Sequence, residues 1–355
     1  MKSEKVFVWN LFLLHYCSSK RKFAAVFNDI QLCLNCSKER ILTMTDSPHF
    51  QRQLVIDFLI SEPKKPLIVI LGPTASGKTA FSIRLAHELQ GFGKTAEVVN
   101  ADSRQLYRGF DIGTAKITPD EMQGIRHHLI DVLDPQQDCT IAWYKQEAQR
   151  VITDIHTRGN IPLLVGGSML YVSALIDGFE PLAPSDPSIR ERLGREYDMD
   201  NGKTLFAKLS MIDPDTAASF SVKNKVYVIR ALEIYESTGK TKSSQKKKNL
   251  GAYDLLMFGM DVDKNELGKR IAARTTLMLE RGWIEEVRSL RHKGVTLTDP
   301  AMKSVGYREI FDAIQCNDIE TDKLAELINS GTRAYAKRHM TWWKRDPRVH
   351  WITPG

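Results

Sequence analysis

The sequence predicts an α/β fold in which helices flank a parallel sheet, and three observations support this. An apolar run from Leu67 to Leu71 leads directly into G-x-x-x-x-G-K-T, which ends at Thr79. Two further apolar runs, 96–100 and 161–165, follow at intervals long enough for helices. Strands that alternate with helices form parallel sheets. With the glycine-rich motif, this order predicts a P-loop NTPase-like core.

The glycine-rich motif predicts a phosphate-binding loop followed by a helix from Lys78 to about Leu89. Its two glycines let successive backbone amides face an anion, Lys78 supplies a positive charge, and the Thr79 hydroxyl can ligate Mg²⁺. The positive end of the helix dipole adds to this attraction. The predicted diphosphate-binding residues are Gly72, Pro73, Thr74, Ala75, Ser76, Gly77, Lys78 and Thr79, with Thr79 as the metal ligand.

Polar residues follow the next two predicted strands, and ligands of parallel sheets bind beyond the carboxyl ends of the strands. Asp102 comes just after the strand 96–100, and Ser168 follows the strand 161–165. A carboxylate beside a phosphate loop can take a proton from a nucleophile or hold Mg²⁺ through water. The alternative for Asp102 is a helix N-cap. The segments 111–116 and 166–171 add hydroxyls and a cation, or are tight turns.

Prolines at 181, 184 and 187 mark a change of composition, after which helices are expected at 190–196, 203–211 and 226–236. The polar stretch 237–249 predicts an exposed loop. A strand at 255–259 then returns to the sheet, and a helical pattern begins at Glu266. Its expected core positions are Leu267, Ile271, Leu277, Leu279 and Ile284. The predicted domains are an extension (1–43), a core (44–180 and 253–355) and an inserted helical domain (181–252).

The composition, 355 residues with 42% apolar content, predicts a globular chain without a membrane span. Five cysteines over this length favour a reducing compartment. Cys33 and Cys36 have metal-like spacing but lack a second ligand pair. The net charge is +7, of which the segment before Thr43 carries +4 (seven Lys and Arg, three acids). That segment is either a targeting leader or an upstream extension of the reading frame.

Seven segments carry a family resemblance: GPTASGKT, ADSRQLYRGFDIGTAK, HHLIDVLDP, IPLLVGGSMLY, RALEIYESTGK, SVGYRE and TRAYAKRHMTWWKRD. They occur in the order seen in tRNA dimethylallyltransferases, and the chain resembles this family from Pro66 to Trp351. The resemblance implies a nucleotide-kinase-like core and an inserted helical domain that grips the anticodon arm. It implies transfer of the dimethylallyl group of dimethylallyl diphosphate to the exocyclic amine of the adenosine beside the anticodon.

Carried onto this chain, the resemblance makes Asp102 the general base, with Lys78 and Ser168 as further catalytic residues, while the loop holds the diphosphate leaving group. Backbone amides, Lys78 and Mg²⁺ suit the charge that develops on diphosphate. Ser168 stands where the family has a threonine that touches substrate. The resemblance also implies tRNA contacts by Asp102, Ser103, Arg104, Gln105, Ser168, Arg190, Val226, Tyr227, Val228, Ile229 and Arg230.

The largest departure from the family is the segment 220–227, where Tyr227 replaces an expected arginine. Lys223 and Lys225 can supply charge nearby, so we expect rearranged tRNA contacts and retained catalysis. The target base must leave its stack, and Tyr107 is a candidate to cover it. Trp342 and Trp343 are expected in the core. A terminal cluster is either a solvated face or a contact to tRNA phosphates: Arg333, Lys337, Arg338, His339, Lys344 and Arg345.

Three rival functions remain open at this point: a small-molecule or nucleotide kinase, a prenyltransferase acting on free AMP or ADP, and a non-catalytic tRNA-binding protein. No cysteine and histidine pair follows the last predicted helix, which favours a bacterial-type enzyme without an appended zinc finger. We expect a cytoplasmic monomer, with a mitochondrial or plastid leader at 1–43 as the alternative.

Overall fold

The computed structural model describes residues 48–178, 186–244, 251–316 and 319–354. The extension 1–43, with Cys33 and Cys36, lies outside the described residues, and so do residues 245–249 of the predicted exposed loop. The first described helix is α3 (Pro48–Ile60).

A six-stranded sheet with the order β3-β2-β4-β1-β5-β6 forms the core, and every neighbouring pair is parallel. The four predicted strands are confirmed. Two strands were not predicted: β3 has only two residues, and β6 has four, of which only Val349 and Ile352 are buried, so neither shows a long apolar run. The strands are β1 (Pro66–Leu71), β2 (Ala96–Asn100), β3 (His127–His128), β4 (Ile161–Gly166), β5 (Asp254–Met260) and β6 (Val349–Ile352).

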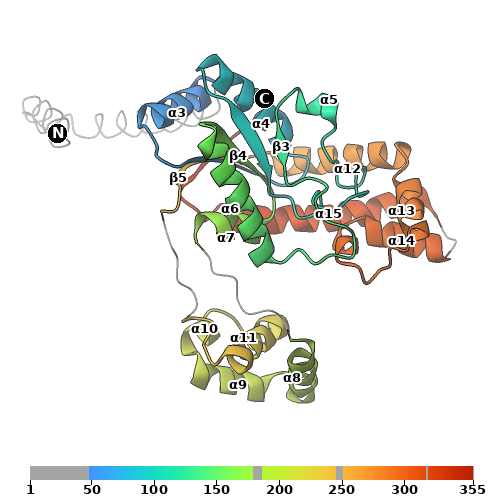
Figure 1. Ribbon diagram of the computed structural model, residues 1–355. Helices are drawn as coiled ribbons and strands as arrows, with labels where there is room; N and C mark the ends of the chain where they lie inside the picture. Colours follow the sequence, from blue (N-terminus) through green and yellow to red (C-terminus); the bar gives the residue numbers. More distant parts are fainter. Residues whose placement is uncertain (1–47, 179–185, 245–250, 317–318, 355) are drawn as a thin grey trace, which may run out of the picture. The chain divides into compact units, whose positions relative to one another are not determined.

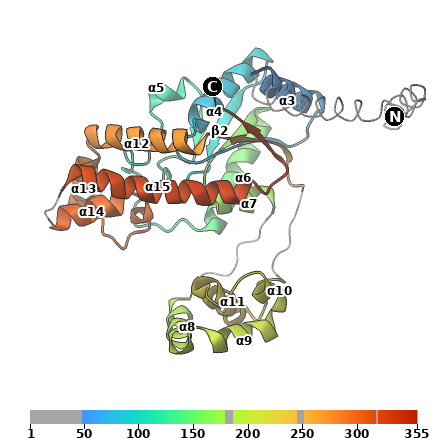
Figure 2. The ribbon, with the colours of Figure 1, turned by 180° about the vertical axis from the view of Figure 1, so that it is seen from behind.

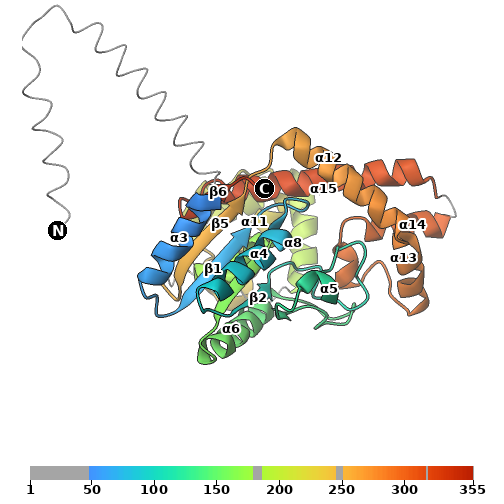
Figure 3. The same cartoon turned by 90° about the horizontal axis from the view of Figure 1, so that it is seen from above.

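Helices cover both faces of the sheet (Figures 1 and 3). Successive strand residues point to opposite faces. Leu67, Val69 and Leu71 therefore share one face, where they belong to the same buried cluster as residues of α6 (Ile141–Thr157) and α7 (Met169–Ile176). On the other face, Phe81 of α4 (Lys78–Gly91) meets Phe258 of β5 edge to face, with ring centroids 5.4 Å apart.

The chain after β5 forms a group of helices in which α12 and α15 lie side by side (Figure 2). Leu267 and Ile271 are buried as predicted, but the prediction for Leu277 was wrong, because it is 44% exposed. The neighbouring Met278 is buried, since the apolar stripe of α12 passes through that position. The elements are α12 (Lys264–Glu280), α13 (Trp283–His292), η1 (Pro300–Lys303), α14 (Tyr307–Cys316) and α15 (Thr321–Trp343).

Four helices between residues 186 and 244 pack around a small apolar core of their own (Figure 2). Leu193, Leu209 and Leu232 lie at its centre and are fully buried. Side chains of Asp186 and Asp213 cap two of the helices, each followed by a proline at the first helical position. The helices predicted here are confirmed: they are α8 (Pro187–Asp200), α9 (Lys203–Ile212) and α11 (Lys225–Thr238), joined by the short α10 (Pro214–Ala218).

Candidate active site

The phosphate loop joins β1 to α4 through a backbone that only small residues permit. A methyl group on Gly72 would lie 2.6 Å from Ser76 Oγ and 2.8 Å from Met260 Cβ, so no side chain fits there. Gly77 caps α4 with a φ of 86°, in the left-handed region that favours glycine. The loop therefore brings its amides and the positive end of α4 to the carboxyl edge of the sheet.

Lys78 is tied into this loop, since its Nζ donates a hydrogen bond to the Pro73 carbonyl oxygen at 2.7 Å. Burial lowers the pKa of Lys78 to about 8; the negative charge of Asp102 opposes this shift and the positive charge of Arg274 adds to it. A lysine held in this way can present its charge to an anion in the loop.

Asp102 stands just beyond β2 in a turn that the buried Asn100 holds in place. Asn100 Oδ1 accepts the Asp102 N–H at 3.0 Å, and Asn100 Nδ2 donates to the carbonyl oxygens of Asp102 (3.1 Å) and Leu129 (2.9 Å). Asp102 Oδ1 accepts the Arg104 N–H at 2.9 Å. The turn thus fixes one carboxylate oxygen and leaves Oδ2 as the oxygen that can receive a proton.

Ser168 links the turn after β4 to the turn after β2. Its Oγ accepts the Ser103 N–H at 2.9 Å, and its own N–H donates to the Ala101 carbonyl at 3.1 Å. Gly166 makes this close approach possible, because a methyl group there would lie 2.2 Å from the Ala101 carbonyl carbon. Ser168 thus positions the Asp102 turn, and its predicted contact with substrate stays a prediction.

Two cavities meet at Asp102. The smaller, about 70 Å³, has Lys78 and Thr79 in its wall, and the larger, about 350 Å³, has Trp283 and Tyr335 in its wall. Four residues line both cavities: Thr74, Asp102, Thr114 and Arg274. A group bound at the phosphate loop and a group bound in the larger cavity would therefore both face the Asp102 carboxylate.

Arg274 is a site residue that was not predicted from the sequence. It lies on α12 and lines both cavities, and burial lowers the pKa of its guanidinium while the Asp102 charge opposes that shift. In the sequence, only its place one turn after Ile271 marks it, because an arginine on an apolar helix stripe is unusual. Asn100 was not predicted either, although an asparagine that ends an apolar strand is a comparable signal in the sequence.

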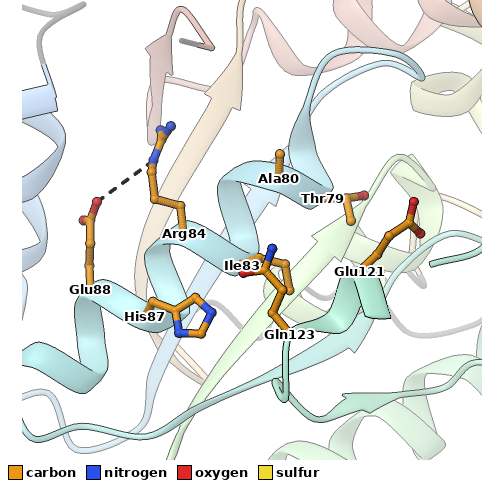
Figure 4. Close-up of a pocket in the computed structure, with 8 residues that line it drawn as sticks. All are labelled: Thr79, Ala80, Ile83, Arg84, His87, Glu88, Glu121 and Gln123. Atoms are coloured by element: carbon orange, nitrogen blue, oxygen red, sulfur yellow. Dashed lines mark ion pairs between the residues drawn. The ribbon is translucent and has the colours of Figure 1, made fainter. Parts of the chain in front are cut away.

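An open groove of about 800 Å³ lies beside the loop, along α4 and near α5 (Pro119–Met122) (Figure 4). Arg84 and Glu88 form an ion pair at 4.0 Å on its α4 side. Thr79 lines both this groove and the small cavity, whereas Lys78 and Asp102 line only the cavities. The two cavities therefore form the candidate active site.

The residues after Asp102 support the turn through backbone contacts. Arg104 Nη1 donates to the Pro300 carbonyl oxygen at 3.1 Å, and Gln105 Nε2 donates to the carbonyl oxygens of Thr114 (3.1 Å) and Ala115 (3.2 Å). Tyr107 does not cover the cavities as expected. It is 2% exposed, and its hydroxyl donates to the Gln137 carbonyl oxygen, because its ring packs into the core beside Phe110.

In the helical domain, the two predicted RNA-binding arginines share one carboxylate. Arg190 (3.0 Å) and Arg230 (2.9 Å) both pair with Glu233, whose side chain is fully buried. Tyr227 is 55% exposed and contacts Phe220, with ring centroids 5.6 Å apart. Of the other predicted contacts, Val226 is exposed, whereas Val228 and Ile229 are buried in the domain core.

The terminal cluster divides between the surface and the interior of α15. Its lysines and arginines are exposed, and Arg338 lines the larger cavity. His339 is fully buried, so neither a solvated face nor a tRNA phosphate contact describes it. Trp343 is buried as predicted, but Trp342 is 46% exposed, because successive residues of a helix point in directions about 100° apart.

The described residues hold no group of three or more His, Cys, Asp or Glu side chains arranged for a metal. Thr79 and Asp102, however, both line the small cavity, and their side chains carry oxygen donors of the kind that Mg²⁺ prefers. Mg²⁺ commonly uses one or two protein oxygens and completes its shell with water and substrate phosphates. The donor set therefore fits Mg²⁺, and the prediction that Thr79 is its protein ligand stays a prediction.

Comparison with known proteins decides the family. The family model for IPP transferase matches residues 105–346, which is more than half of the chain. The chain belongs to the IPP transferase family. A tRNA dimethylallyltransferase of Geobacter sulfurreducens is 40% identical over 292 residues, covering 81% of this chain and 92% of that one. A tRNA dimethylallyltransferase of Corynebacterium diphtheriae is 41% identical over 295 residues, covering 82% of this chain and 95% of that one.

Solved structures agree with this membership. The tRNA isopentenylpyrophosphate transferase of Bacillus halodurans is 38% identical with a TM-score of 0.60, covering 81% of this chain and 90% of that one. A eukaryotic dimethylallyltransferase, described as acting on tRNA, is 28% identical with a TM-score of 0.65, covering 79% and 70%. The predicted fold class and family resemblance are therefore confirmed. Among the described residues, no helix of this IPP transferase family member is long and apolar enough to span a membrane.

Proposed function

We propose that this IPP transferase family member transfers the dimethylallyl group of dimethylallyl diphosphate to N6 of the adenosine adjacent to the anticodon in tRNA. The observation that carries the proposal is the position of Asp102, which lines both the cavity of the phosphate loop and the larger cavity. A base placed there can serve an acceptor in one cavity while the leaving group departs in the other. The relatives named tRNA dimethylallyltransferase support the same reaction.

In this mechanism the adenine amine attacks the allylic carbon, the bond from that carbon to the diphosphate oxygen breaks, and Asp102 Oδ2 receives the amine proton. The loop amides, Lys78 and Arg274 stabilise the negative charge that develops on the diphosphate. Mg²⁺ held by Thr79 would neutralise further charge on the same group. Asn100 and Ser168 keep the Asp102 turn in place through the hydrogen bonds described above.

In this proposal the acceptor adenine of the tRNA occupies the larger cavity. An adenine stacked in the anticodon loop cannot reach Asp102, so it must be extruded, as for other enzymes that act on bases. We propose that the exposed residues Tyr227, Val226 and Arg338 contact tRNA, together with the arginines that Glu233 orients. A cytoplasmic monomer remains our expectation.

The test is transfer of labelled dimethylallyl diphosphate to an unmodified anticodon stem-loop in the presence of Mg²⁺, for wild type and Asp102→Asn. Loss of a general base should lower the transfer rate by about two to four orders of magnitude. Inorganic diphosphate binding serves as the control and should persist in the variant, since Asp102 is not part of the loop. Equal rates for both proteins, transfer to AMP instead of RNA, or ATP turnover without an allylic donor would each overturn the proposal in favour of a rival function.

A further inference from the structure

His127 lines the small cavity, and its place there follows from the short strand β3. In the parallel pairing of β2 with β3, His127 lies opposite Val98. Val98 and Asn100 share a face of the sheet because they are two residues apart, and both line the small cavity with His127. His128 points to the other face, where its Nε2 lies 2.7 Å from Glu97 Oε2. The segment HHLIDVLDP thus places the first of its histidines in the candidate active site.

A hydrogen bond at one ring nitrogen of His127 fixes the state of the other. His127 Nδ1 lies 2.8 Å from the Ile125 carbonyl oxygen, which can only accept, so Nδ1 carries a proton. Burial lowers the pKa of His127 from its usual 6.5, which keeps the ring neutral at neutral pH. A neutral ring with its proton on Nδ1 has a lone pair on Nε2. Among the described residues, no protein atom donates a hydrogen bond to this Nε2.

The side-chain amides and most hydroxyls of the cavity wall are turned to backbone carbonyl oxygens, so they do not serve Nε2. These donors are Ser82 Oγ to Thr79, Asn100 Nδ2 to Asp102 and Leu129, Gln105 Nε2 to Thr114 and Ala115, and Thr114 Oγ1 to Phe110. Three other donors in the wall, on Lys78, Thr79 and Arg274, are those that the proposed function assigns to diphosphate and metal. The donor for Nε2 must therefore come from a group bound in the cavity.

Water bound to a cation is the donor that suits this position. Mg²⁺ usually keeps several of its waters, and it prefers oxygen ligands to imidazole nitrogen. The charge of the cation polarises these waters and makes them strong donors. Diphosphate oxygens are acceptors, so they would repel a second lone pair. Because the cavity of about 70 Å³ has room for only a few waters, a hydrated cation in it lies close to every wall.

We propose that His127 Nε2 accepts a hydrogen bond from a water molecule bound to Mg²⁺, so that His127 belongs to the cation site of the small cavity. The bond from Nδ1 to the Ile125 carbonyl holds the ring in the tautomer that this requires. This inference rests on the proposed function, because it requires Mg²⁺ and diphosphate to be bound together beside Thr79.

The experiment measures the Kd of inorganic diphosphate by calorimetry in the full chain, once with Mg²⁺ and once with a chelator. The ratio of the two Kd values gives the contribution of the metal to binding. His127→Asn keeps a donor for the Ile125 carbonyl but has no acceptor at the position of Nε2. Its ratio should fall about tenfold, which is a usual cost of losing a group that hydrogen-bonds to a metal ligand. His127→Gln places an amide oxygen near the position of Nε2 and should keep most of the ratio.

His128→Asn is the matched control, because His128 is the neighbouring residue of β3 and lines neither cavity. It should lower the thermal stability through the lost contact with Glu97 and leave the ratio of Kd values unchanged. Thermal unfolding shows whether each variant is folded. If His127→Asn does not fold, His127→Leu replaces it, since leucine also lacks an acceptor.

A wild-type ratio in the asparagine or leucine variant would overturn the inference. An equal loss in the glutamine variant would overturn it as well, since it would indicate packing of the ring alone. Weaker diphosphate binding in the presence of the chelator would also overturn it, because the ring would then act without the metal. If Mg²⁺ does not strengthen diphosphate binding to the wild type, the metal role in the proposed function fails, and the inference fails with it.

Discussion

At the scale of single residues, the site depends on two cations of different kinds. Arg274 comes from α12 and keeps its charge at all accessible pH values, whereas Lys78 comes from the loop and loses its charge as the pH rises through about 8. Both lie near the Asp102 carboxylate, which opposes the lowering of each pKa. Their roles can therefore be separated by charge and by pH.

We expect Arg274→Gln to lower the transfer rate by about two to three orders of magnitude, because the developing charge on the leaving group loses a preorganised donor. Rapid-quench measurement of a single turnover with labelled donor checks this. Arg270→Gln, on the same helix but paired with Glu266 on the surface, is the control and should react at the wild-type rate. A wild-type rate in Arg274→Gln would exclude the guanidinium from the reaction.

The lowered pKa of Lys78 predicts that diphosphate binding depends on pH. Its pKa of about 8 in the free protein means that the ammonium charge is lost as pH rises through that value. Binding should therefore weaken, and the Kd should rise, above about pH 8 after correction for the titration of diphosphate itself. Calorimetry from pH 6.5 to 9.5 measures this. Lys78→Arg, whose charge persists, should show no such weakening even if its binding is weaker overall; the same pH profile in both proteins would contradict the assignment.

At the scale of elements, one carboxylate connects three neighbouring strands of the sheet. Glu97 of β2 accepts hydrogen bonds from His128 of β3 at 2.7 Å, and from Arg158 (2.8 Å) and Asn160 (2.7 Å) just before β4. Burial alone would raise the pKa of Glu97, but the bonds from Asn160, His128 and Arg158 outweigh it and lower the pKa to about 2. The network thus joins β2 to the strands on either side of it near the start of β2.

We expect Glu97→Gln to lower the free energy of unfolding by about 3 kcal/mol, because it removes the buried carboxylate charge to which Arg158, Asn160 and His128 are hydrogen-bonded. The folded pKa lies below the unfolded value of 4.5, so this stabilisation is fully present above pH 4.5 and is lost as pH falls toward 2. Urea unfolding between pH 3 and 7 measures both effects. The difference between wild type and variant should shrink on acidification, and a constant difference would contradict the network.

At the scale of the whole molecule, two separate cores imply two separable functions. Helices α8 to α11 surround their own apolar cluster, while the sheet and its helices surround another. Replacing residues 181–250 with a Gly/Ser linker should therefore leave diphosphate binding and its thermal stabilisation intact. Affinity for the anticodon stem-loop should fall at least about tenfold, because Tyr227 and the Glu233-bound arginines are removed.

Filter binding at two salt concentrations measures the affinity for the anticodon stem-loop, and calorimetry measures the affinity for diphosphate. Unchanged RNA affinity would show that the sheet domain alone recognises tRNA. Loss of diphosphate binding would show that the two cores are not independent.

The local parts of this protein could be predicted from its residues alone. A glycine-rich loop between an apolar run and a helix has one favoured backbone path, so Gly72 to Thr79, the first strands and the place of Asp102 at a strand end were predictable. The motifs in the sequence were also sufficient to identify the family. Short or half-exposed strands such as β3 and β6 were missed, because they lack a continuous apolar pattern.

Contacts between residues that lie far apart along the chain could be seen only in the folded structure. Arg274 reaches Asp102, and His339 lies behind the phosphate loop, because α12 and α15 pack side by side at that end of the sheet. The burial of Tyr107 and of His339 likewise depends on neighbours far along the chain. Residue spacing reports the face of a single helix or strand, whereas the partner of that face is set by packing between elements that the spacing does not record.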